Sequence, residues 1–463
     1  MFRKIQKIHL VGIGGVGMSG IAEVLLNRGY SVSGSDIKLS PVTQRLATLG
    51  ATILQGHQGE NLGSADVVVL SSAIKPDNPE VIEARQRHIP IIPRAEMLAE
   101  LMRLKYGITI AGTHGKTTTT SMVATVLQHA GMDPTVVVGG RLNSLGSNAK
   151  LGTGDFMVVE ADESDRSFLM LTPTVAVVTN IDEDHMESYR GLDDLKQAFL
   201  QFVNKVPFYG AAILCKDDPN ISSILPAVKR RVLTYGFSPQ ADLQITNACQ
   251  QGSESQFKLS LRNKEFGRFI VKVPGKHNVL NAAAAVAVGI DLEIPEDNLR
   301  EALENFVGAD RRFQTKGQAR GVTIVDDYAH HPTEILTTLE GARNLGCRRL
   351  YVVFQPHRYS RTQYCLEGFS RCFEFADVLV LADIYPAGEE AIEGVNSSNL
   401  VESIRQHGHK NVRYVGSLDD IVSLVEKELL PGDLFMTMGA GNVWRVGEEL
   451  LKRLGDRHGE KNR

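Results

Sequence analysis

The chain has 463 residues, of which 43% are hydrophobic and 22% charged, and its formal net charge is −4. This length exceeds what one hydrophobic core serves, so two or three domains are expected. The composition is that of a soluble globular protein, and the slight negative charge excludes the global basic field that marks many proteins binding nucleic acid or a membrane surface.

The cysteines and the N-terminus indicate the compartment. Five cysteines, at positions 215, 249, 347, 365 and 372, form no CxxC pair. An odd, scattered set favours free thiols in a reducing cytosol over a disulfide framework. Residues 1–8 lack the features of a signal peptide, and no stretch is long and apolar enough to span a bilayer. We expect a cytoplasmic protein without membrane insertion, present as a monomer or a weak homo-oligomer.

The first block, from Ile8 to about Lys105, alternates strands with helices. Strands are expected at Ile8–Ile13, Ser31–Ser35 and Asp66–Leu70, and helices at Met18–Arg28 and Pro79–Arg87. This alternation predicts a parallel sheet with helical crossovers.

The turn after the first strand reads Gly12-Ile13-Gly14-Gly15-Val16-Gly17, which fits GxGxxG between a strand and a helix. Such a turn lets a diphosphate approach the backbone, and Asp36, which ends the next strand, could bind a ribose. Alone, the pattern suggests a nicotinamide-dependent oxidoreductase. A UDP diphosphate is a second candidate, and close packing of helix against strand is a third interpretation.

The second block starts at Gly107 and has apolar strands typical of a sheet buried on both faces. They are expected at Ile108–Ala111, Thr135–Val138, Phe156–Glu160 and Val175–Thr179, with an antiparallel hairpin within 242–273 and a helix at Asn278–Val288.

A second glycine-rich loop, Gly112-Thr113-His114-Gly115-Lys116-Thr117-Thr118, lies between a strand and a helical pattern. Its backbone amides could surround phosphate oxygens of ATP, with Lys116 on the β/γ-phosphates and Thr117 on Mg²⁺. The loop is a variant, because the usual pattern needs glycine where this chain has Ile110. A glycine-rich turn without function is the alternative.

Two acidic runs, Glu160–Asp165 and Asn180–His185, follow strands of the same block. Hard oxygen ligands suit Mg²⁺, and we select Glu160 and His185 for a second metal site. Most of the other acids are expected to be solvated loop residues. Further on, Asn278 and Asn281 share a helix face and could bind an adenine edge, although N-capping by Asn278 is the simpler interpretation.

The third block begins near Arg311 and again predicts an open doubly wound sheet. Its strands are expected at Val322–Asp326, Leu350–Phe354, Val378–Ala382, Val412–Val415 and Leu434–Met438. Adjacent His330 and His331 should point in different directions, so at most one faces a ligand. Arg358 and Arg361 could converge on one anion if a helix starts there, although surface arginine is the simpler interpretation.

Taken together, these motifs resemble the Mur ligases of peptidoglycan synthesis over nearly the whole chain. The resemblance rests on Gly112–Thr118, Glu160–Asp165, Asn180–His185, His277–Asn281 and Asp326–Pro332. Gly14–Gly20 and Gln355–Thr362 resemble the branch that joins L-alanine to UDP-N-acetylmuramate. A related branch that attaches a recycled tripeptide is the closest alternative.

This resemblance implies an α/β fold of three domains, each on a mostly parallel doubly wound sheet: a Rossmann-like UDP-sugar domain (1–106), a P-loop-type ATP domain (107–310) and a Rossmann-like closing domain (311–463). It implies UDP-N-acetylmuramate, L-alanine and ATP as substrates and an acyl-phosphate intermediate.

The resemblance also implies a role for each candidate residue. The Gly14–Gly17 turn would hold the UDP diphosphate, with His57, Ser71 and Ser72 in loops lining that site. Thr117, Glu160 and His185 would surround Mg²⁺, and Asn278 and Asn281 would meet the adenine. His357 and Arg361, with Arg358 nearby, would hold the amino acid, and Arg312 and His330 would lie near the reacting groups. Several relatives carry a carbamylated lysine where this chain has Phe199, which leaves open what replaces that charge.

Overall fold

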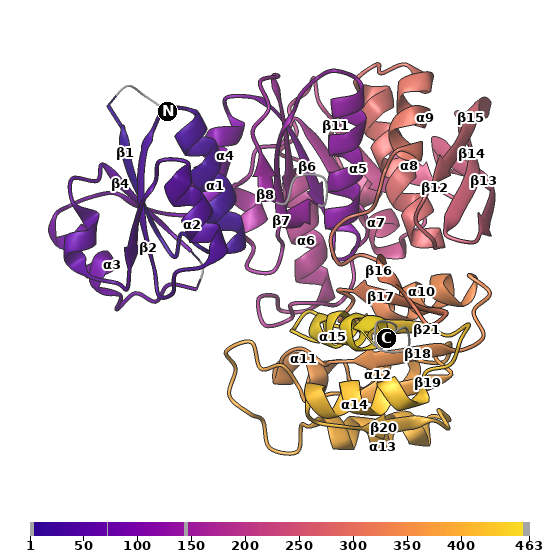
Figure 1. Ribbon diagram of the computed structural model, residues 1–463. Helices are drawn as coiled ribbons and strands as arrows, with labels where there is room; N and C mark the ends of the chain where they lie inside the picture. Colours follow the sequence, from indigo (N-terminus) through magenta and orange to yellow (C-terminus); the bar gives the residue numbers. More distant parts are fainter. Residues whose placement is uncertain (1–3, 72, 143–146, 457–463) are drawn as a thin grey trace. The chain divides into compact units, whose positions relative to one another are not determined.

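The computed structural model describes residues 4–71, 73–142 and 147–456. The chain forms two compact units. The first comprises Met1–Asn247, Phe257–Phe269 and Leu280–Val307, and the second comprises Ala248–Gln256, Ile270–Val279 and Gly308–Arg463. The described residues form three sheets (Figure 1). No helix among the described residues is long and apolar enough to cross a membrane.

The first sheet has five parallel strands in the order β3-β2-β1-β4-β5. They are β1 (Lys7–Val11), β2 (Ser31–Asp36), β3 (Thr52–Gln55), β4 (Val67–Leu70) and β5 (Ile91–Pro93); the helices are α1 (Val16–Asn27), α2 (Pro41–Thr48), the 3-10 turn η1 (Gly59–Leu62), α3 (Pro79–Gln86) and α4 (Arg94–Met102). The strand order reverses on either side of β1, which is where open α/β sheets bind ligands.

The second sheet has ten strands in the order β15-β14-β13-β12-β11-β10-β6-β9-β7-β8. They are β6 (Tyr106–Ala111), β7 (Thr135–Leu142), β8 (Ser147–Lys150), β9 (Phe156–Glu160), β10 (Val175–Val178), β11 (Ala211–Cys215), β12 (Val232–Gly236), β13 (Leu243–Gln251), β14 (Glu254–Leu261) and β15 (Lys264–Val271). Its central strands β9, β6, β10 and β11 pair in parallel and are buried along most of their length.

Two-residue turns join β13 to β14 and β14 to β15, and turns this short make these neighbouring strands antiparallel. At the second turn, Arg262 and Asn263 both adopt left-handed φ angles, of 49° and 66°, as a tight hairpin turn demands. The predicted hairpin is therefore confirmed and extended by one strand.

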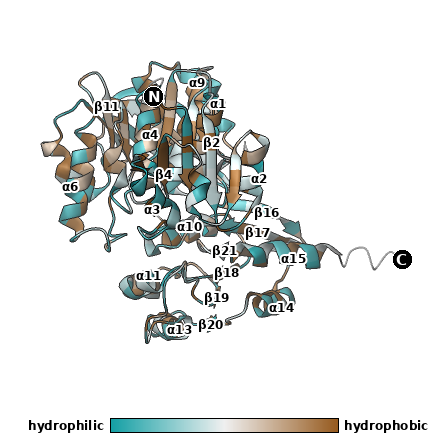
Figure 2. Cartoon of the chain, turned by 90° about the vertical axis from the view of Figure 1, so that its left-hand side faces the viewer, coloured by the Kyte–Doolittle hydropathy of each residue, from teal (hydrophilic) through white to brown (hydrophobic). Residues whose placement is uncertain are grey.

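The helices of the second block are α5 (Lys116–His129), η2 (Ser167–Met170), α6 (Leu192–Val203), α7 (Pro219–Ile224), η3 (Leu225–Ala227), α8 (Lys276–Asp291) and α9 (Glu296–Glu304). Figure 2 shows hydrophobic residues along β4 and both hydrophobic and hydrophilic residues on α6. The buried residues of α6 recur at helical spacing and include Phe199, which packs on Phe168 at 5.2 Å. Phe199 is therefore a residue of the hydrophobic core, and it cannot replace the negative charge that a carbamylated lysine supplies in several relatives.

The third sheet has six strands in the order β16-β17-β21-β18-β19-β20, parallel except for the β16/β17 pair. The strands are β16 (Gln314–Ala319), β17 (Val322–Asp327), β18 (Leu350–Phe354), β19 (Val378–Leu381), β20 (Val412–Tyr414) and β21 (Leu434–Met438); the helices are α10 (Pro332–Arg343), α11 (Tyr359–Tyr364), α12 (Leu366–Arg371), α13 (Ser397–Gln406), α14 (Leu418–Glu428) and α15 (Trp444–Asp456). Alternate strand residues enter two hydrophobic cores, as in a sheet covered on both faces. The predicted α/β class with mostly parallel sheets is confirmed.

Several element bounds differ from the prediction. The first strand ends at Val11 because Gly12 turns the chain with a φ of 79°. Helix α8 begins at Lys276, after Gly275 (φ 99°), so Asn278 lies inside the helix and the predicted N-cap is wrong. All five cysteines are free, as expected.

Candidate active site

The loop between β6 and α5 has the backbone shape of a phosphate cradle. Gly112 and Gly115 adopt left-handed φ angles of 131° and 79°. A Cβ at Gly112 would lie 2.1 Å from Thr179 Oγ1, and one at Gly115 would lie 2.6 Å from Asn281 Oδ1. Glycine is therefore needed at both positions. Ile110, which stands where the usual pattern has glycine, is a fully buried residue of β6. Because the strand continues to Ala111, this loop is shorter than the usual one.

Two amides of this loop are already bonded to the protein. Thr113 N donates to Asn180 O at 3.2 Å, and His114 N donates to Asn180 Oδ1 at 2.8 Å. His114 Nε2 also lies 2.9 Å from Asp182 Oδ2. Residues 115–118 form the start of α5, where a helix leaves its first N–H groups without helical partners. An anion would bind best at this helix end, which carries positive partial charge.

Lys116 has its ammonium group enclosed at the loop. Its Nζ donates to Gly112 O at 2.7 Å, to Thr113 O at 3.0 Å and to Glu163 Oε1 at 2.9 Å. Burial by itself would lower the pKa of Lys116, but the nearby carboxylates of Glu163 and Asp162 outweigh it and raise that pKa. The lysine therefore stays charged at neutral pH.

Glu163 is a residue that the sequence did not single out. It was expected among solvated loop acids, but it is only 1% exposed, whereas Asp162 and Asp165 are exposed as expected. Tyr189 OH donates to Glu163 O at 2.5 Å and holds the backbone there. Among the described residues, Glu163 Oε2 is buried without a hydrogen-bond partner. The sequence around Glu163 is a run of acidic residues. Such runs are usually exposed to solvent, so nothing in the local sequence indicated that Glu163 is buried.

Thr117 and Glu160 lie together at the end of β9. Thr117 Oγ1 donates to Glu160 Oε1 and Oε2 at 3.0 and 3.1 Å. A hydroxyl and a carboxylate at this spacing offer the oxygen ligands that Mg²⁺ prefers, so this pair fits the ion. His185 has a left-handed φ of 58°, and its ring nitrogens lie 3.6 Å from Asp184 and from Glu187. Its place in a metal site stays a prediction.

The two asparagines of α8 are both 5% exposed and both make polar contacts with the protein. Asn278 Nδ2 donates to Pro274 O at 2.7 Å. Asn281 Oδ1 accepts from Thr119 Oγ1 at 3.1 Å, beside Gly115 of the phosphate loop. Asn281 thus supports the loop directly, and contact of either amide with an adenine stays a prediction.

The glycine turn after β1 is held by hydrogen bonds from β2. Gly12 N and Ile13 N both donate to Ser35 O, at 2.9 and 3.0 Å. Gly14 N donates to Asp36 Oδ2 at 2.9 Å, so Asp36 supports the turn itself. A Cβ at Gly14 would lie 2.8 Å from the same oxygen, which explains the glycine.

Other predicted residues lie beside this turn. A Cβ on Gly12 would lie 3.1 Å from Ser71 Cβ, which places Ser71 against the turn. A Cβ on Gly17 would lie 2.8 Å from an Arg94 Nη atom. Arg94, at the start of α4, is a cation near the turn that no sequence motif indicated. Ser72 and the side chain of Val16 lie outside the described residues.

His57 is tied to the interior of the first sheet. Its Nδ1 lies 3.0 Å from Ser35 Oγ and 3.3 Å from Glu80 Oε2. The imidazole is 14% exposed, so one edge reaches solvent. Glu80, which the sequence analysis did not select, is completely buried.

In the third block, Arg312 and His330 gather around Tyr328 and Glu334. The Arg312 guanidinium carbon lies 5.1 Å from the Tyr328 ring centre, and its Nη1 lies 3.7 Å from Glu334. His330 Nδ1 lies 3.0 Å from Tyr328 O and 3.5 Å from Glu334. His331 instead accepts from Thr333 N at 3.4 Å and caps α10, so the two histidines do point in different directions.

His357 lies between two rings. It stacks on Tyr385 at 5.6 Å and 9°, and the ring of His330 meets it edge-on at 5.9 Å. Arg361 Nη1 lies 3.5 Å from His357 Nδ1. Burial and the positive charges of Arg361 and Arg358 lower the pKa of His357 to about 4, so it is neutral at neutral pH. Tyr385 was missed because it lies in a loop after the next strand.

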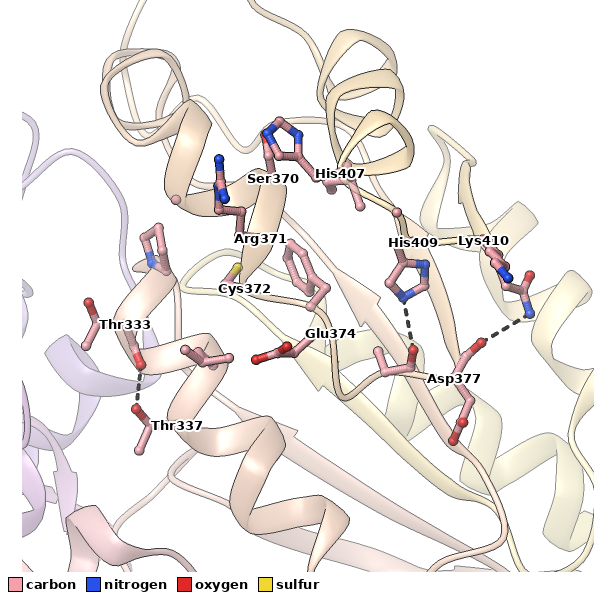
Figure 3. A pocket seen from close by; sticks show the side chains of 18 residues that line it. Thr333, Thr337, Ser370, Arg371, Cys372, Glu374, Asp377, His407, His409 and Lys410 are labelled. Atoms are coloured by element: carbon pink, nitrogen blue, oxygen red, sulfur yellow. Dashed lines mark hydrogen bonds between the residues drawn. The ribbon is translucent and has the colours of Figure 1, made fainter.

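The two arginines of this segment face different partners. Arg358, with a φ of 70°, precedes α11, and its Nη1 lies 3.8 Å from Glu389, whereas Arg361 lies by His357. A pocket of about 850 Å³ in the same unit, lined by α10, α12 and the end of α13, contains none of the predicted site residues. Figure 3 shows Arg371, His407 and His409 around it. None of the contacts described above links this pocket to the predicted site residues.

The known protein families that match this chain correspond to its three blocks. Three family models match the chain: "Mur ligase family, catalytic domain" at residues 7–106, "Mur ligase middle domain" at 110–289 and "Mur ligase, glutamate ligase domain" at 311–441. The three-domain α/β class is thereby confirmed.

Individual relatives agree with these models. The UDP-N-acetylmuramate–L-alanine ligase of Geobacter sp. (strain M21) is 56% identical over 455 residues, which are 98% of this chain and 99% of the relative. The structure of the UDP-N-acetylmuramate–alanine ligase of Thermotoga maritima matches with a TM-score of 0.82 and 30% identity, covering 97% of this chain and 99% of that one. A murein peptide ligase from Psychrobacter arcticus matches with a TM-score of 0.71 and 26% identity, covering 97% and 99%. This chain therefore belongs to the Mur ligase family.

Proposed function

We propose that the chain joins L-alanine to the lactyl carboxylate of UDP-N-acetylmuramate in an ATP-dependent reaction. The observation that carries the proposal is the 56% identity, over nearly the whole chain, to ligases named for this reaction. The site supports it, because the chain has two separate glycine-rich loops whose backbone could hold phosphates, and a third cluster of cationic and aromatic side chains.

The first chemical step would be phosphoryl transfer. A lactyl carboxylate oxygen attacks the γ-phosphorus of ATP, the bond to the β-phosphate oxygen breaks, and ADP leaves with that electron pair. The amides of residues 115–118 and the Lys116 ammonium would hold the phosphates, so that catalysis is mainly positioning and charge neutralisation. Lys116 would exchange part of its present contact with Glu163 for phosphate oxygens.

Magnesium would belong at Thr117 and Glu160, whose oxygens already lie within 3.1 Å of each other. His185 is the third proposed ligand. Bound there, Mg²⁺ would neutralise charge on the phosphates.

The second step would form the amide. The neutral amine of L-alanine attacks the acyl-phosphate carbon and a tetrahedral oxyanion forms. The bond from that carbon to the phosphoryl oxygen then breaks, and inorganic phosphate leaves with the former carboxylate oxygen and with the proton that the amine nitrogen loses. Arg361 would hold the α-carboxylate as a bidentate fork, and neutral His357 would form part of the wall beside it. Water must be excluded, because it would hydrolyse the acyl phosphate.

The remaining predicted residues have supporting roles in this proposal. Asp36, His57, Ser71 and Ser72 would line the UDP-sugar site with the turn 14–17, while Arg312 and His330 would lie near the reacting groups. We also propose domain bounds of 1–106, 107–310 and 311–463, which the matched family segments support. Use of ATP and a UDP-sugar supports a cytoplasmic location.

Two alternatives are disfavoured. The first alternative is a tripeptide-recycling ligase. The murein peptide ligase shares the fold, but it matches less well than the alanine ligase, with 26% identity and a TM-score of 0.71 against 30% and 0.82. A nicotinamide-dependent oxidoreductase would need no second phosphate loop, and the turn's own Asp36 oxygen is already bonded to Gly14.

Isotope transfer tests the proposed reaction. UDP-N-acetylmuramate carrying ¹⁸O at both oxygens of its lactyl carboxylate, incubated with ATP, Mg²⁺ and L-alanine, should yield ADP and phosphate containing one ¹⁸O atom per turnover. Release of AMP, or phosphate without the label, would rule out the acyl-phosphate route. Reduction of a nicotinamide instead of ADP release would favour the oxidoreductase.

A further inference from the structure

The hydrogen bonds of the Lys116 ammonium group leave it no hydrogen for a phosphate oxygen. An ammonium group carries three hydrogens. Nζ of Lys116 donates to Gly112 O, Thr113 O and Glu163 Oε1, at 2.7, 3.0 and 2.9 Å. Contact with a nucleotide phosphate therefore requires that at least one of these three hydrogen bonds break.

The three partners of Lys116 differ in origin and in charge. Gly112 O and Thr113 O lie four and three positions before Lys116, in the loop that carries it, so they keep the ammonium group over its own loop. Glu163 lies 47 positions away, in the segment after β9, and it is the partner that is charged. A charged acceptor binds an ammonium group more strongly than a neutral carbonyl does. Glu163 is therefore the partner that competes most with a phosphate oxygen.

The backbone of Glu163 is held in place by two donors. Its carbonyl accepts from Tyr189 OH at 2.5 Å and from Arg166 N at 3.1 Å. The Arg166 guanidinium carbon lies 4.9 Å from the centre of the Tyr189 ring, and Arg166 donates two hydrogen bonds, of 2.9 and 3.0 Å, to Asp194 of α6. These contacts limit how far the Glu163 carboxylate can follow Lys116 toward a bound nucleotide.

The other carboxylate oxygen of Glu163 makes the Lys116 contact costly to break. In the part of the chain that the structure describes, Oε2 is buried without a hydrogen-bond partner, and the residue is 1% exposed. A buried charge needs hydrogen bonds or an opposite charge, and Lys116 supplies both to Glu163. A carboxylate beside the loop also repels phosphate oxygens. Both effects weaken the binding of a nucleotide at this loop.

We propose that Glu163 is a positioning residue that competes with the nucleotide for Lys116. It holds the ammonium group over the loop and yields it when phosphates bind, so it lowers nucleotide affinity and speeds the release of ADP. This proposal rests on the proposed function for the nucleotide that Lys116 meets. The sign of its effect separates it from a structural role. Loss of a structural contact would loosen the loop and weaken binding, whereas loss of a competitor strengthens binding.

Calorimetry with ADP and the full chain, once in EDTA and once in Mg²⁺, measures this competition. Glu163→Gln keeps the size of the side chain and removes its charge. The Kd of this variant for ADP should fall at least about 10-fold under both conditions, as expected for one hydrogen bond to a charged group. Dissociation of a fluorescent ADP analogue, followed by stopped flow, should slow by a similar factor, while the affinity for UDP-N-acetylmuramate should stay native.

Two more variants separate the contact from the net charge. Glu163→Asp keeps the charge but withdraws the carboxylate by one methylene. It should also bind ADP more tightly than the native protein, although by a smaller factor, and it carries the test if Glu163→Gln does not fold. Asp165→Asn removes an exposed charge of the same acidic run. Because Asp165 makes none of the three Lys116 contacts, this control should bind ADP with native affinity.

Four outcomes decide between the interpretations. Unchanged or weaker ADP binding in Glu163→Gln would overturn the proposal, and weakening confined to Mg²⁺ would assign Glu163 to the metal instead. Equal tightening in Asp165→Asn would reduce the effect to net charge and would also overturn it. If the native protein binds ADP but forms no amide with any amine, the proposed function fails while the role of Glu163 stands on the ADP data. If the native protein does not bind ADP, both fail.

Discussion

Replacing Lys116 with alanine should damage both the chemistry and the fold. The sequence alone predicts a lysine needed for phosphoryl transfer and dispensable for stability. In the structure, however, the ammonium makes three hydrogen bonds, one of them to the buried Glu163 carboxylate. Lys116→Ala leaves that carboxylate without its charge partner in the interior.

The magnitude follows from this pairing. Removing one member of a buried ion pair costs about 3–5 kcal/mol. Burial raises the pKa of Glu163, so the acid can take up a proton in the variant, and we expect the low end, about 3 kcal/mol. A loss of this size lowers the melting temperature by about 6–12 °C in a folding unit of about 200 residues. Turnover should fall at least about 10²-fold, as with loss of other preorganised charge contacts.

The double variant Lys116→Ala/Glu163→Gln separates the two effects. It should recover most of the lost melting temperature and none of the activity, because the buried charge is gone but the phosphate contact is still missing. Scanning fluorimetry without nucleotide and ADP release measure the two quantities. Lys229→Ala, at an exposed position, is the matched control. If Lys116→Ala melts like the native protein, or if the double variant is no more stable than the single one, the reasoning from the buried pair is refuted.

Three further predictions concern the other regions. Gly15→Ala places a Cβ 3.3 Å from Gly12 O, so that carbonyl must shift by a few tenths of an ångström. The variant should raise the KM for UDP-N-acetylmuramate about 10-fold by blocking backbone approach, and an unchanged KM would exclude this turn. Arg361→Lys should raise the KM for L-alanine while leaving that for ATP nearly unchanged, since lysine offers no bidentate fork; equal changes in both would contradict this. His277 is half-buried, and its pKa is lowered to about 4, chiefly by desolvation of the ring and then by the charge of Arg312. The unfolded chain therefore binds more protons between pH 6.5 and 4, so stability contributed by neutral His277 is lost as pH falls through that window. His277→Phe should flatten the acid side of the stability curve in denaturant titrations, and an unchanged slope would be the contrary result.

The sequence predicted those features of the site that depend on local backbone chemistry. The strand–glycine–helix junctions at Gly112–Lys116 and Gly12–Gly15 are set by glycine conformation and by neighbours in the chain, and both were found from spacing alone. Runs of apolar residues likewise predicted the buried strands. Where a turn shortened an element, as at Gly12, the prediction was wrong by one or two residues.

The side chains that pair with the charged groups of the site could not be predicted, because the two members of each pair lie far apart in the sequence. Glu163 meets Lys116 across 47 positions, and Glu80 meets Ser35 across 45. An acid in a polar run has no local signal of burial; only the fold places it against a cation or a hydroxyl. The same holds for Tyr385, whose stacking on His357 depends on two neighbouring strands ending side by side.

The most direct test of the central claim compares amines with one sugar nucleotide. ADP release is measured with UDP-N-acetylmuramate, ATP and Mg²⁺, adding L-alanine, glycine, L-serine or the tripeptide L-Ala-D-Glu-diaminopimelate, and each product is confirmed by mass. We predict the highest kcat/KM for L-alanine. Glycine and serine should react more slowly but measurably, since one methyl or hydroxyl changes binding by only about 1–3 kcal/mol, and the tripeptide should fail on size. A higher kcat/KM for the tripeptide than for L-alanine would contradict the account and identify a recycling ligase.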